Sequence, residues 1–493
     1  MSTSIPFGEW LPDQPSFGLQ GCVTASNVIP DINSYRSFPS LVTFSNSISG
    51  VAKGSIFATD AAFNNYNYVG DSGALYRLVA QSFTVASRVA GGIYNVGIED
   101  FWEFANWGNT VIGVNGFIDA PQLITLGATN FADMTIGLKA KHIGVMRDFV
   151  VMGNVSDSAT NVYRVRWSAI NNPLSWVVSA ATLADYQDLP SEGGPVQKVI
   201  GGEYGIVFQK RSIWRMQFVG APVIFQFDRV HNLIGAYVPQ AVVGYQNLVF
   251  FLAEDGFYAF DGVNLDPIGR GKVDRFFFAD LSTSNFQRIN ASIDQTNKLV
   301  MWAYPSASTT GGNPDKILCY SWAFKRWSLI EGLNITYFMQ SISTGYTLEG
   351  LDAISTDLDA LGWPLDSVQW TGGQIITSAF NATNQLALFN GSAMAAIIET
   401  GEFQLFKDSR AMLVEVRPDT IGLSASATIT VLNRNNLTES LSVGSTSAFP
   451  NATGFVQTRC SARYFRIRLN TSNATNFTHL IGVGVTGVVA GVR

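Results

Sequence analysis

The chain has 493 residues, of which 47% are hydrophobic and 14% are charged, and its formal net charge is −6. An average soluble domain carries about 25% charged residues, so much of the polar surface must come from uncharged side chains and glycine. This composition excludes a disordered chain. The net negative charge argues against a protein that binds nucleic acid by neutralising its phosphates. The length predicts two or three domains.

The N-terminal segment, PFGEWLPDQPSFGLQGCVTASNVIPD at 6–31, combines four prolines with many large apolar side chains. Proline interrupts regular structure because it lacks a backbone donor and fixes φ. The apolar groups argue against the alternative of a solvated, disordered leader. We therefore predict an extended arm over 1–40 that lies on a protein surface. Its candidate assembly residues are Phe7, Trp10, Leu11, Pro12, Asp13 and Phe17.

Targeting and redox signals are sparse. The start, MSTSIPFGEW, lacks the basic and apolar regions of a secretory signal, which predicts synthesis in a cytoplasm. The apolar run at 479–493 is rich in glycine and shorter than the roughly 20 residues that span a bilayer, so we predict no membrane span. Three distant cysteines, Cys22, Cys319 and Cys460, predict buried free thiols.

Candidate strands follow one another along most of the chain. They are short, rich in aromatic and β-branched residues, and bounded by Gly, Asn or Asp turn signals, as hairpins require. They lie at 66–78, 109–117, 148–154, 204–218, 248–262 and 298–305. This pattern predicts an all-β protein.

The apolar centres of these strands recur at intervals of about 40 to 50 residues, the size of a four-stranded propeller blade. The centres are Val69, Ile112, Val150, Val207, Phe250, Val300, Phe338 and Leu388. The spacing predicts a β-propeller core over 41–391 with about six to eight blades, and an array of β-sandwiches is the alternative. Aromatic residues of the hairpins are expected to pack between blades, namely Tyr76, Tyr163, Trp214 and Tyr258.

Two segments depart from this pattern. Residues 346–367 space Leu351, Ile354, Leu358 and Leu361 at helical intervals, which predicts a short helix. From about residue 392 the alternation of apolar and polar residues becomes cleaner, as in LSASATITV (423–431) and RYFRIRL (463–469). A period of two indicates half-buried antiparallel strands, so we predict a C-terminal β-sandwich-like domain over 392–493.

Chemistry-bearing motifs are weak. The three histidines, His142, His231 and His479, show no metal-ligand spacing, and the chain has no phosphate-binding glycine loop. We predict no catalytic, cofactor-binding or metal-binding residues. Turn acids such as Glu254 and Asp255 could serve a propeller glycosidase, but the sequence AEDGFYAFDG predicts instead a structural turn at Asp255 and Gly256.

An ordered series of segments resembles the tail nozzle, or tail hub, proteins of short-tailed bacteriophages, which include subunits described as packaged-DNA stabilisation proteins. The series is PFGEWLPDQPSF, ASNVIPDINSYRSFPSL, LAEDGFYAFDGVNLDPIGRGKVDRFF, ALFNGSAMAAIIETGEFQL and RYFRIRL, and it covers nearly the whole chain. The resemblance implies a β-propeller with an added β domain, assembled as a homo-hexameric ring below the portal and its adaptor. It carries over no catalytic residue, and it marks the arm around Trp10, Pro12 and Asp13 and the turn at Asp255 and Gly256 as architectural.

The function implied by the resemblance is structural. A subunit of the virion tail would extend the DNA channel, help retain the packaged genome and let it pass during ejection without sequence-specific binding. Its partners would be the adaptor or portal, the tail needle and the tail fibre or spike proteins. The alternatives are a tail-associated propeller glycosidase or depolymerase and a carbohydrate-binding adhesin. We also expect the arm to clasp a neighbouring subunit or the adaptor, so that a chain lacking residues 1–35 would fold but fail to join the ring.

Overall fold

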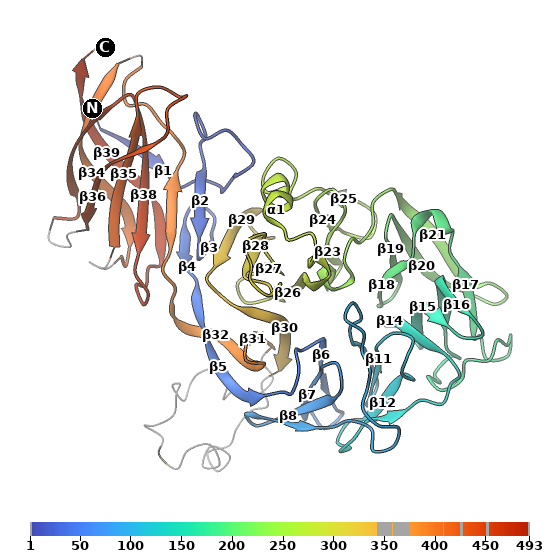
Figure 1. Ribbon diagram of the computed structural model, residues 1–493. Helices are drawn as coiled ribbons and strands as arrows, with labels where there is room; N and C mark the ends of the chain where they lie inside the picture. Colours follow the sequence, from blue (N-terminus) through green and yellow to red (C-terminus); the bar gives the residue numbers. More distant parts are fainter. Residues whose placement is uncertain are drawn as a thin grey trace.

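A computed structural model describes residues 2–342, 357, 375–407, 409–423, 427–449 and 453–491. Nearly all regular structure in these ranges is β-strand, arranged as a β-propeller with a β-sandwich beside it (Figure 1). The predicted helix at 346–367 falls outside the described residues. All three cysteines are buried and free, which confirms the prediction of unpaired thiols.

The propeller consists of seven four-stranded antiparallel units among the described residues. Each blade forms because short apolar strands alternate with tight turns, so successive strands pair with their sequence neighbours. Blades 1 to 3 contain β6 (Gly54–Thr59), β7 (Asn65–Gly70), β8 (Leu75–Val79) and β9 (Ser82–Val85); β10 (Glu103–Trp107), β11 (Thr110–Val114), β12 (Gln122–Thr125) and β13 (Ala132–Asp133); and β14 (Lys139–Met146), β15 (Phe149–Ser156), β16 (Thr160–Trp167) and β17 (Asp185–Asp188).

Blades 4 to 6 continue the same order around the ring. They contain β18 (Val196–Ile200), β19 (Gly205–Gln209), β20 (Ser212–Gly220) and β21 (Ile224–Asn232); β22 (Val243–Tyr245), β23 (Leu248–Leu252), β24 (Phe257–Phe260) and β25 (Leu265–Asp266); and β26 (Asn290–Asp294), β27 (Leu299–Tyr304), β28 (Lys316–Ser321) and β29 (Arg326–Glu331). A single-turn 3-10 helix precedes the first strand of each of these three blades, at Ser191–Gly193, Pro239–Ala241 and Phe286–Arg288.

Blade 7 closes the ring with strands from both ends of the propeller sequence. Its inner strands are β30 (Ile335–Ile342), β31 (Ile375–Asn381) and β32 (Gln385–Ala393), and its outer strand is β5 (Pro39–Ser47) from the N-terminal side. β5 pairs antiparallel with β32, from Ser47 opposite Gln385 to Pro39 opposite Ala393. The propeller strands therefore run from Pro39 to Ala393, compared with the predicted 41–391.

The β-sandwich has two sheets that draw on both chain ends. One sheet contains β1 (Ser2–Pro6), β3 (Val28–Pro30), β4 (Tyr35–Ser37), β34 (Arg410–Ile421), β37 (Val456–Ala462) and β39 (His479–Gly491). The other contains β2 (Cys22–Ser26), β33 (Ile397–Thr400), β35 (Ala427–Arg434), β36 (Ser442–Ala448) and β38 (Tyr464–Thr471). Residues 1–40 were predicted to form an extended arm on a protein surface. In the structure this segment instead supplies four strands to the sandwich.

A continuous hydrogen-bonded sheet joins the sandwich to the propeller. β2 pairs with the outer strand of blade 6, β29, and with β33 on its other side, so that nine strands form one sheet. One hydrophobic core also runs through the junction and includes Trp10, Trp327 and Phe465, which come from the arm, blade 6 and the sandwich. Propeller and sandwich are therefore packed as one body.

Most apolar centres chosen from the sequence occupy the same place in successive blades. Val69, Ile112, Val150, Val207, Phe250 and Val300 all lie on the second strand of blades 1 to 6, and each is buried. Phe338 and Leu388 lie on β30 and β32 of one blade, which is why eight centres correspond to seven blades. Of the predicted core aromatics, Tyr76, Trp214 and Tyr258 are buried, whereas Tyr163 is half-buried.

The alternation predicted for the sandwich is confirmed on β38, where Phe465, Ile467 and Leu469 are buried and the residues between them are partly exposed. Among the described residues there is one α-helix, the seven-residue α1 (Asp274–Asp280), and it had no counterpart in the predictions. It lies between blades 5 and 6, on the side of the propeller that faces the sandwich (Figure 1). Within the described ranges, no helix has the length and apolar character that crossing a membrane requires.

Candidate functional site

The predicted assembly residues of the arm lie on the protein's own body. Phe7 and Trp10 are 1% and 2% exposed, and Trp10 Nε1 donates to the Val23 carbonyl at 3.0 Å. The ring of Trp10 packs edge-on against Phe276 of α1, with 5.3 Å between the ring centroids. Phe17 is 44% exposed and packs edge-on against Tyr464 of the sandwich. The arm therefore docks within its own chain, on α1 and on the sandwich.

Asp13 caps the first turn of α1 from a distant part of the sequence. Its carboxylate oxygens accept the backbone N–H groups of Arg275 at 2.9 Å and Phe276 at 2.8 Å. The helix's own N-cap position holds Val273, which has no side-chain acceptor, so Asp13 supplies the missing acceptor. Leu11 and Pro12 are half-buried and bring Asp13 to the helix. This contact explains why the segment is irregular yet ordered.

The predicted structural turn meets the same helix. Gly256 has a φ of +155°, and a Cβ atom there would lie 2.3 Å from Asp274 Oδ2, so no other residue fits without displacing that carboxyl. Phe257 N–H donates to Asp274 Oδ1 at 3.2 Å. Burial raises the pKa of Asp274 to about 6, and the negative charges of Asp13 and Asp255 add to the rise. The structure thus brings the predicted arm and the predicted turn together around Asp274, a residue that no sequence pattern had singled out.

Arg326, at the start of β29, holds the arm from the propeller side. It is 6% exposed, and its guanidinium donates to the Gly8 carbonyl at 2.6 Å and also to the Phe7 carbonyl. The same group donates to the carbonyls of residues 31, 32 and 34 and stacks over the Tyr35 ring at 4.5 Å. Backbone oxygens thus pair with both terminal nitrogens of this buried cation, which fixes the path of the whole segment from β1 to β4.

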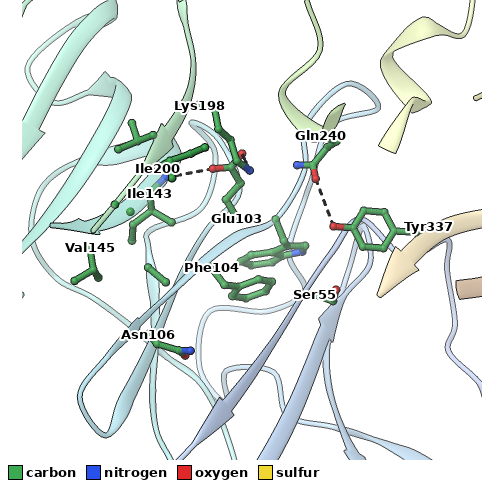
Figure 2. Close-up of a pocket in the computed structure, with 15 residues that line it drawn as sticks. Ser55, Glu103, Phe104, Asn106, Ile143, Val145, Lys198, Ile200, Gln240 and Tyr337 are labelled. Atoms are coloured by element: carbon green, nitrogen blue, oxygen red, sulfur yellow. Dashed lines mark hydrogen bonds and ion pairs between the residues drawn. The ribbon is translucent and has the colours of Figure 1, made fainter. Parts of the chain in front are cut away.

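An axial cavity of about 390 Å³ lies where the inner strands of the blades converge (Figure 2). Its polar centre is Glu103 on β10, which is 5% exposed. Glu103 Oε1 lies 2.9 Å from Lys198 Nζ and 3.0 Å from His142 Nδ1, residues of the two following blades. Burial works to raise the pKa of Glu103, but the charges of Lys198 and His142 outweigh it and lower the pKa to about 2. The group ties three blades together as an ion-paired cluster.

A second cavity, of about 520 Å³, adjoins the first because Glu103 and Gln240 line both. We call it the mouth cavity. It lies between the loops of blades 2 to 5 and the 3-10 turn at Phe286–Arg288. Its remaining lining is mainly amide, aromatic and lysine side chains, including Asn154, Gln197, Tyr237, Phe286, Lys141 and Lys210.

Of the three histidines, His142 lines the mouth cavity. His231 lies on β21 beside Phe260, and His479 lies on β39 within hydrogen-bonding distance of Ser34. In the part of the chain that is described, no group of three or more His, Cys, Asp or Glu side chains is arranged to hold a metal ion.

A set of exposed aliphatic side chains lies on the loop that joins blades 1 and 2 and on the loop between β11 and β12 of blade 2. It consists of Val89, Ile93, Ile98 and Ile118, which are 88%, 85%, 76% and 56% exposed. We call this the rim patch. Arg88 donates to the Ile93 carbonyl and to Asp119, so the two loops are neighbours, and exposed large apolar groups on neighbouring loops are typical of interaction surfaces.

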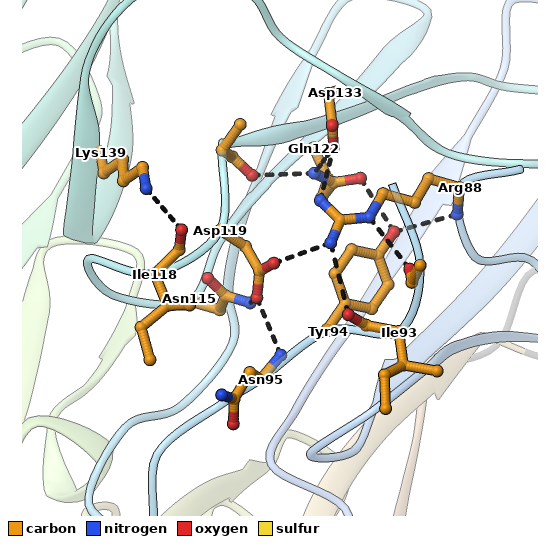
Figure 3. A network of polar contacts seen from close by, with 12 residues as sticks. Arg88, Ile93, Tyr94, Asn95, Asn115, Ile118, Asp119, Gln122, Asp133 and Lys139 are labelled. Carbon is orange, nitrogen blue, oxygen red and sulfur yellow. Dashed lines mark hydrogen bonds and ion pairs between the residues drawn. The ribbon is translucent and has the colours of Figure 1, made fainter. Parts of the chain in front are cut away.

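The loop that carries the rim patch is held in place by Arg88 (Figure 3). The Arg88 guanidinium pairs with Asp119 at 2.8 Å and Asp133 at 2.9 Å, and it lies 4.6 Å from the Tyr94 ring centroid. The Arg88 side chain is 9% exposed. Asp119 also accepts the Asn95 N–H at 3.0 Å. The exposed aliphatic groups therefore project from a rigid base.

The fold places this chain in the class of seven-bladed β-propellers with a fused β-sandwich. No protein-family model and no curated protein matches the sequence. Among solved structures, the chain is similar to the extracellular domain of a hybrid two-component system from B. thetaiotaomicron, with 7% identity, a TM-score of 0.42 and coverage of 86% of this chain and 53% of that chain. It is also similar to the WD40 domain of Pan2 from Neurospora crassa, with 6% identity, a TM-score of 0.39 and coverage of 73% and 96%. The chain thus spans about half the length of the first of these proteins.

Proposed function

We propose that this protein is a structural subunit of the tail nozzle, or hub, of a short-tailed bacteriophage. Six copies form a ring that extends the DNA channel below the portal and adaptor, helps to retain the packaged genome and lets it pass during ejection. The ordered sequence resemblance is the starting point of the proposal. The observation that carries it is the rim patch, a set of exposed aliphatic groups on a loop fixed by buried ion pairs.

A closed ring requires two different surfaces on each subunit, because each copy meets its neighbours head to tail. The rim patch supplies one on blades 1 and 2. A second group of exposed aliphatic side chains, Val414, Val488 and Val489, lies on β34 and β39 of the sandwich, which extends from the propeller beside blade 6 (Figure 1). Because propeller and sandwich share a sheet and a core, contacts at both ends would be transmitted through one rigid body.

The rival function of a propeller glycosidase requires a pair of carboxyl groups, one with a raised pKa that can act as the general acid. In the cavities, the pKa of Glu103 is held at about 2 and Asp100 pairs with Lys141 at 2.7 Å. Glu103 is thus held in its charged form by Lys198 and His142, and Asp100 is engaged in an ion pair. This arrangement favours a structural role for the pair over general acid catalysis.

The proposal is tested by the mass and symmetry of the assembly. The purified chain is imaged by negative-stain electron microscopy and weighed by native mass spectrometry, alone and on a purified head-to-tail adaptor ring. The expected particle has six subunits and an axial hole in at least one of the two conditions. A chain that stays monomeric in both, at concentrations of tens of micromolar, contradicts the proposal.

A variant pair makes the test specific for the rim patch. Ile93→Asp places a charge within the rim patch and is expected to abolish ring formation without changing the melting temperature. Val263→Asp is the matched control, because Val263 is 62% exposed on a hairpin at the other end of the blades. Rings that form equally well with Ile93→Asp show that the rim patch is not the subunit contact.

A further inference from the structure

The mouth cavity contains a buried hydrogen-bond acceptor without a partner. Asn154 on β15 is 6% exposed, and its Nδ2 donates to the Val196 carbonyl at 3.2 Å. Its Oδ1 has no hydrogen-bond partner among the described residues. Asn154 has a φ of +57° and sits where the register of β15 shifts between Gly153 and Val155. Such a bulge turns a side chain away from the regular pleat, and strained positions of this kind gather at binding sites.

A buried donor without a partner lies across the same cavity. Gln240 is 8% exposed, and its Oε1 accepts the Tyr337 hydroxyl at 3.4 Å. Its Nε2 finds no acceptor in the described part of the chain. Figure 2 shows this nitrogen on the side of the amide that faces Glu103. Buried polar groups are satisfied in the great majority of native proteins, so an unpaired donor and an unpaired acceptor in one cavity point to a ligand that offers both functions.

The lysines around the cavities are neutralised within the chain, and Glu99, which is exposed to solvent at the rim of the mouth cavity, is the one lining carboxylate without an ion pair among the described residues. Each lysine that lines the two cavities has a carboxylate partner: Lys141 with Asp100 at 2.7 Å, Lys198 with Glu103 at 2.9 Å and Lys210 with Glu254 at 3.2 Å. An anionic ligand would have to compete with these carboxylates, and a cationic ligand with the lysines. The electrostatics therefore favour a neutral ligand.

An aromatic wall completes the site. Tyr237 and Phe286 stack with 5.0 Å between centroids and an interplanar angle of 25°, and both are half-buried at the cavity. Aromatic faces provide apolar area against which C–H groups can pack, and a few polar groups then fix orientation. A volume of about 520 Å³ suits a small organic ligand.

We propose that the mouth cavity binds a neutral, polyhydroxylated ligand of the saccharide class. One hydroxyl accepts from Gln240 Nε2, another donates to Asn154 Oδ1, and the C–H face of the sugar ring packs on Tyr237 and Phe286. A hydroxyl group is both donor and acceptor, so one molecule of this class satisfies both unpaired amide atoms. This inference does not rest on the proposed ring, since all the residues belong to one subunit.

The test is saturation-transfer NMR on the full chain with four probes, D-glucose, D-galactose, N-acetyl-D-glucosamine and L-rhamnose, each at millimolar concentration. At least one probe is expected to receive saturation, with a dissociation constant in the millimolar range or below. Two variants remove one unpaired group each: Asn154→Gly, which tolerates the positive φ, and Gln240→Met, which keeps the side-chain length. Each is expected to weaken binding of that probe at least 10-fold.

The control variant is Gln187→Met, which removes an exposed amide on β17 and is expected to leave binding unchanged. The melting temperature of every variant is measured, so that loss of fold is separated from loss of ligand. The proposal is overturned by the absence of saturation on all four sugars, by binding that both folded variants retain, or by inorganic phosphate displacing the bound sugar. A monomer that never forms rings but binds the sugar would contradict the proposed function and leave this inference standing.

Discussion

Replacing Arg326 with Met is the sharpest test of how the N-terminal segment is held. Methionine keeps an unbranched apolar stem but removes the guanidinium, which donates to five carbonyls between Phe7 and Ser34. These carbonyls then lose the charged donor, and the Gly8 carbonyl keeps only weaker, neutral donors such as the Tyr35 hydroxyl at 2.8 Å. The strands that depend on them, β1 to β4, should open more readily than the blades.

The size of the effect follows from the shortest contacts. The hydrogen bonds to the carbonyls of Gly8 and Asp31 measure 2.6 and 2.5 Å. A hydrogen bond to a charged group contributes about 1.5 to 3 kcal/mol, so losing two at the low end lowers the local stability by about 3 kcal/mol. At 1.4 kcal/mol for each factor of ten, this corresponds to opening about 100-fold more often. Arg326→Lys keeps the positive charge but lacks the planar guanidinium. Its local stability should therefore lie between that of the unsubstituted protein and that of Arg326→Met.

Amide hydrogen exchange measured by mass spectrometry reports this opening peptide by peptide. Peptides from residues 2–37 should lose about two orders of magnitude of protection, while peptides from β15 in blade 3 should be unchanged. Arg211→Met is the matched control, because Arg211 is 56% exposed and makes a surface ion pair with Glu254. Protection of 2–37 that is unchanged within about threefold, or an equal loss in all blades, would refute the assignment of Arg326 as the local anchor.

Three further predictions concern charged groups. Glu103→Gln leaves the half-buried Lys198 and the buried His142 without their carboxylate and should lower the free energy of unfolding at pH 7 by about 3 kcal/mol in urea titrations. Because the pKa of Glu103 is lowered to about 2, this difference should shrink as pH falls from about 4.5 towards 2. Asp274→Asn should raise the free energy of unfolding above pH 7 by up to about 3 kcal/mol and give no gain at pH 4. The reason is that the pKa of Asp274 is raised to about 6 in the folded state, so the unsubstituted protein loses stability as pH rises through that value. A thermal shift for Asp274→Asn that is the same at both pH values would contradict this. Asp13→Ala should lower the stability of α1 by about 1 kcal/mol, seen as faster amide exchange confined to residues 275–281, and no change there would mean that Asp13 is not the cap.

The blades could be predicted from the sequence because each is a local structure. Strands that pair with their nearest neighbours leave a regular spacing of apolar runs and turns, and Val69, Ile112 and Val150 occupy equivalent second strands for that reason. Blade 7 could not be read in the same way. Its outer strand β5 comes from more than 300 residues earlier than β32, so nothing local shows that Phe338 and Leu388 share one blade.

The cavities were beyond prediction for a related reason. Glu103 and Lys198 are 95 residues apart, and each appears in the sequence as an ordinary charge on a strand. One signal was available. Glu103 is the first residue of β10, which pairs with the apolar strand β11, and a carboxylate buried beside such a strand needs a partner of opposite charge. Its partners follow only from the circular arrangement of the blades.

For the N-terminal segment, composition predicts that side chains are buried but not which surface buries them. The density of apolar groups correctly indicated that Phe7 and Trp10 are buried. The segment was expected to pack on another subunit, whereas the structure places both residues in the core of their own chain. Removing residues 1–35 would expose that core, so the expectation that such a chain folds no longer holds.

Placing the arm within its own chain changes how a ring would have to be built. An arm that exchanges between subunits would make folding and assembly depend on each other, whereas here Asp13, Arg326 and β1 complete the monomer before any neighbour is met. The subunit contacts must then come from surfaces that remain exposed on the finished body, such as the rim patch. Ring formation should accordingly respond to Ile93→Asp and be insensitive to substitutions in the arm that keep the monomer folded, which is the opposite of what a swapped arm requires.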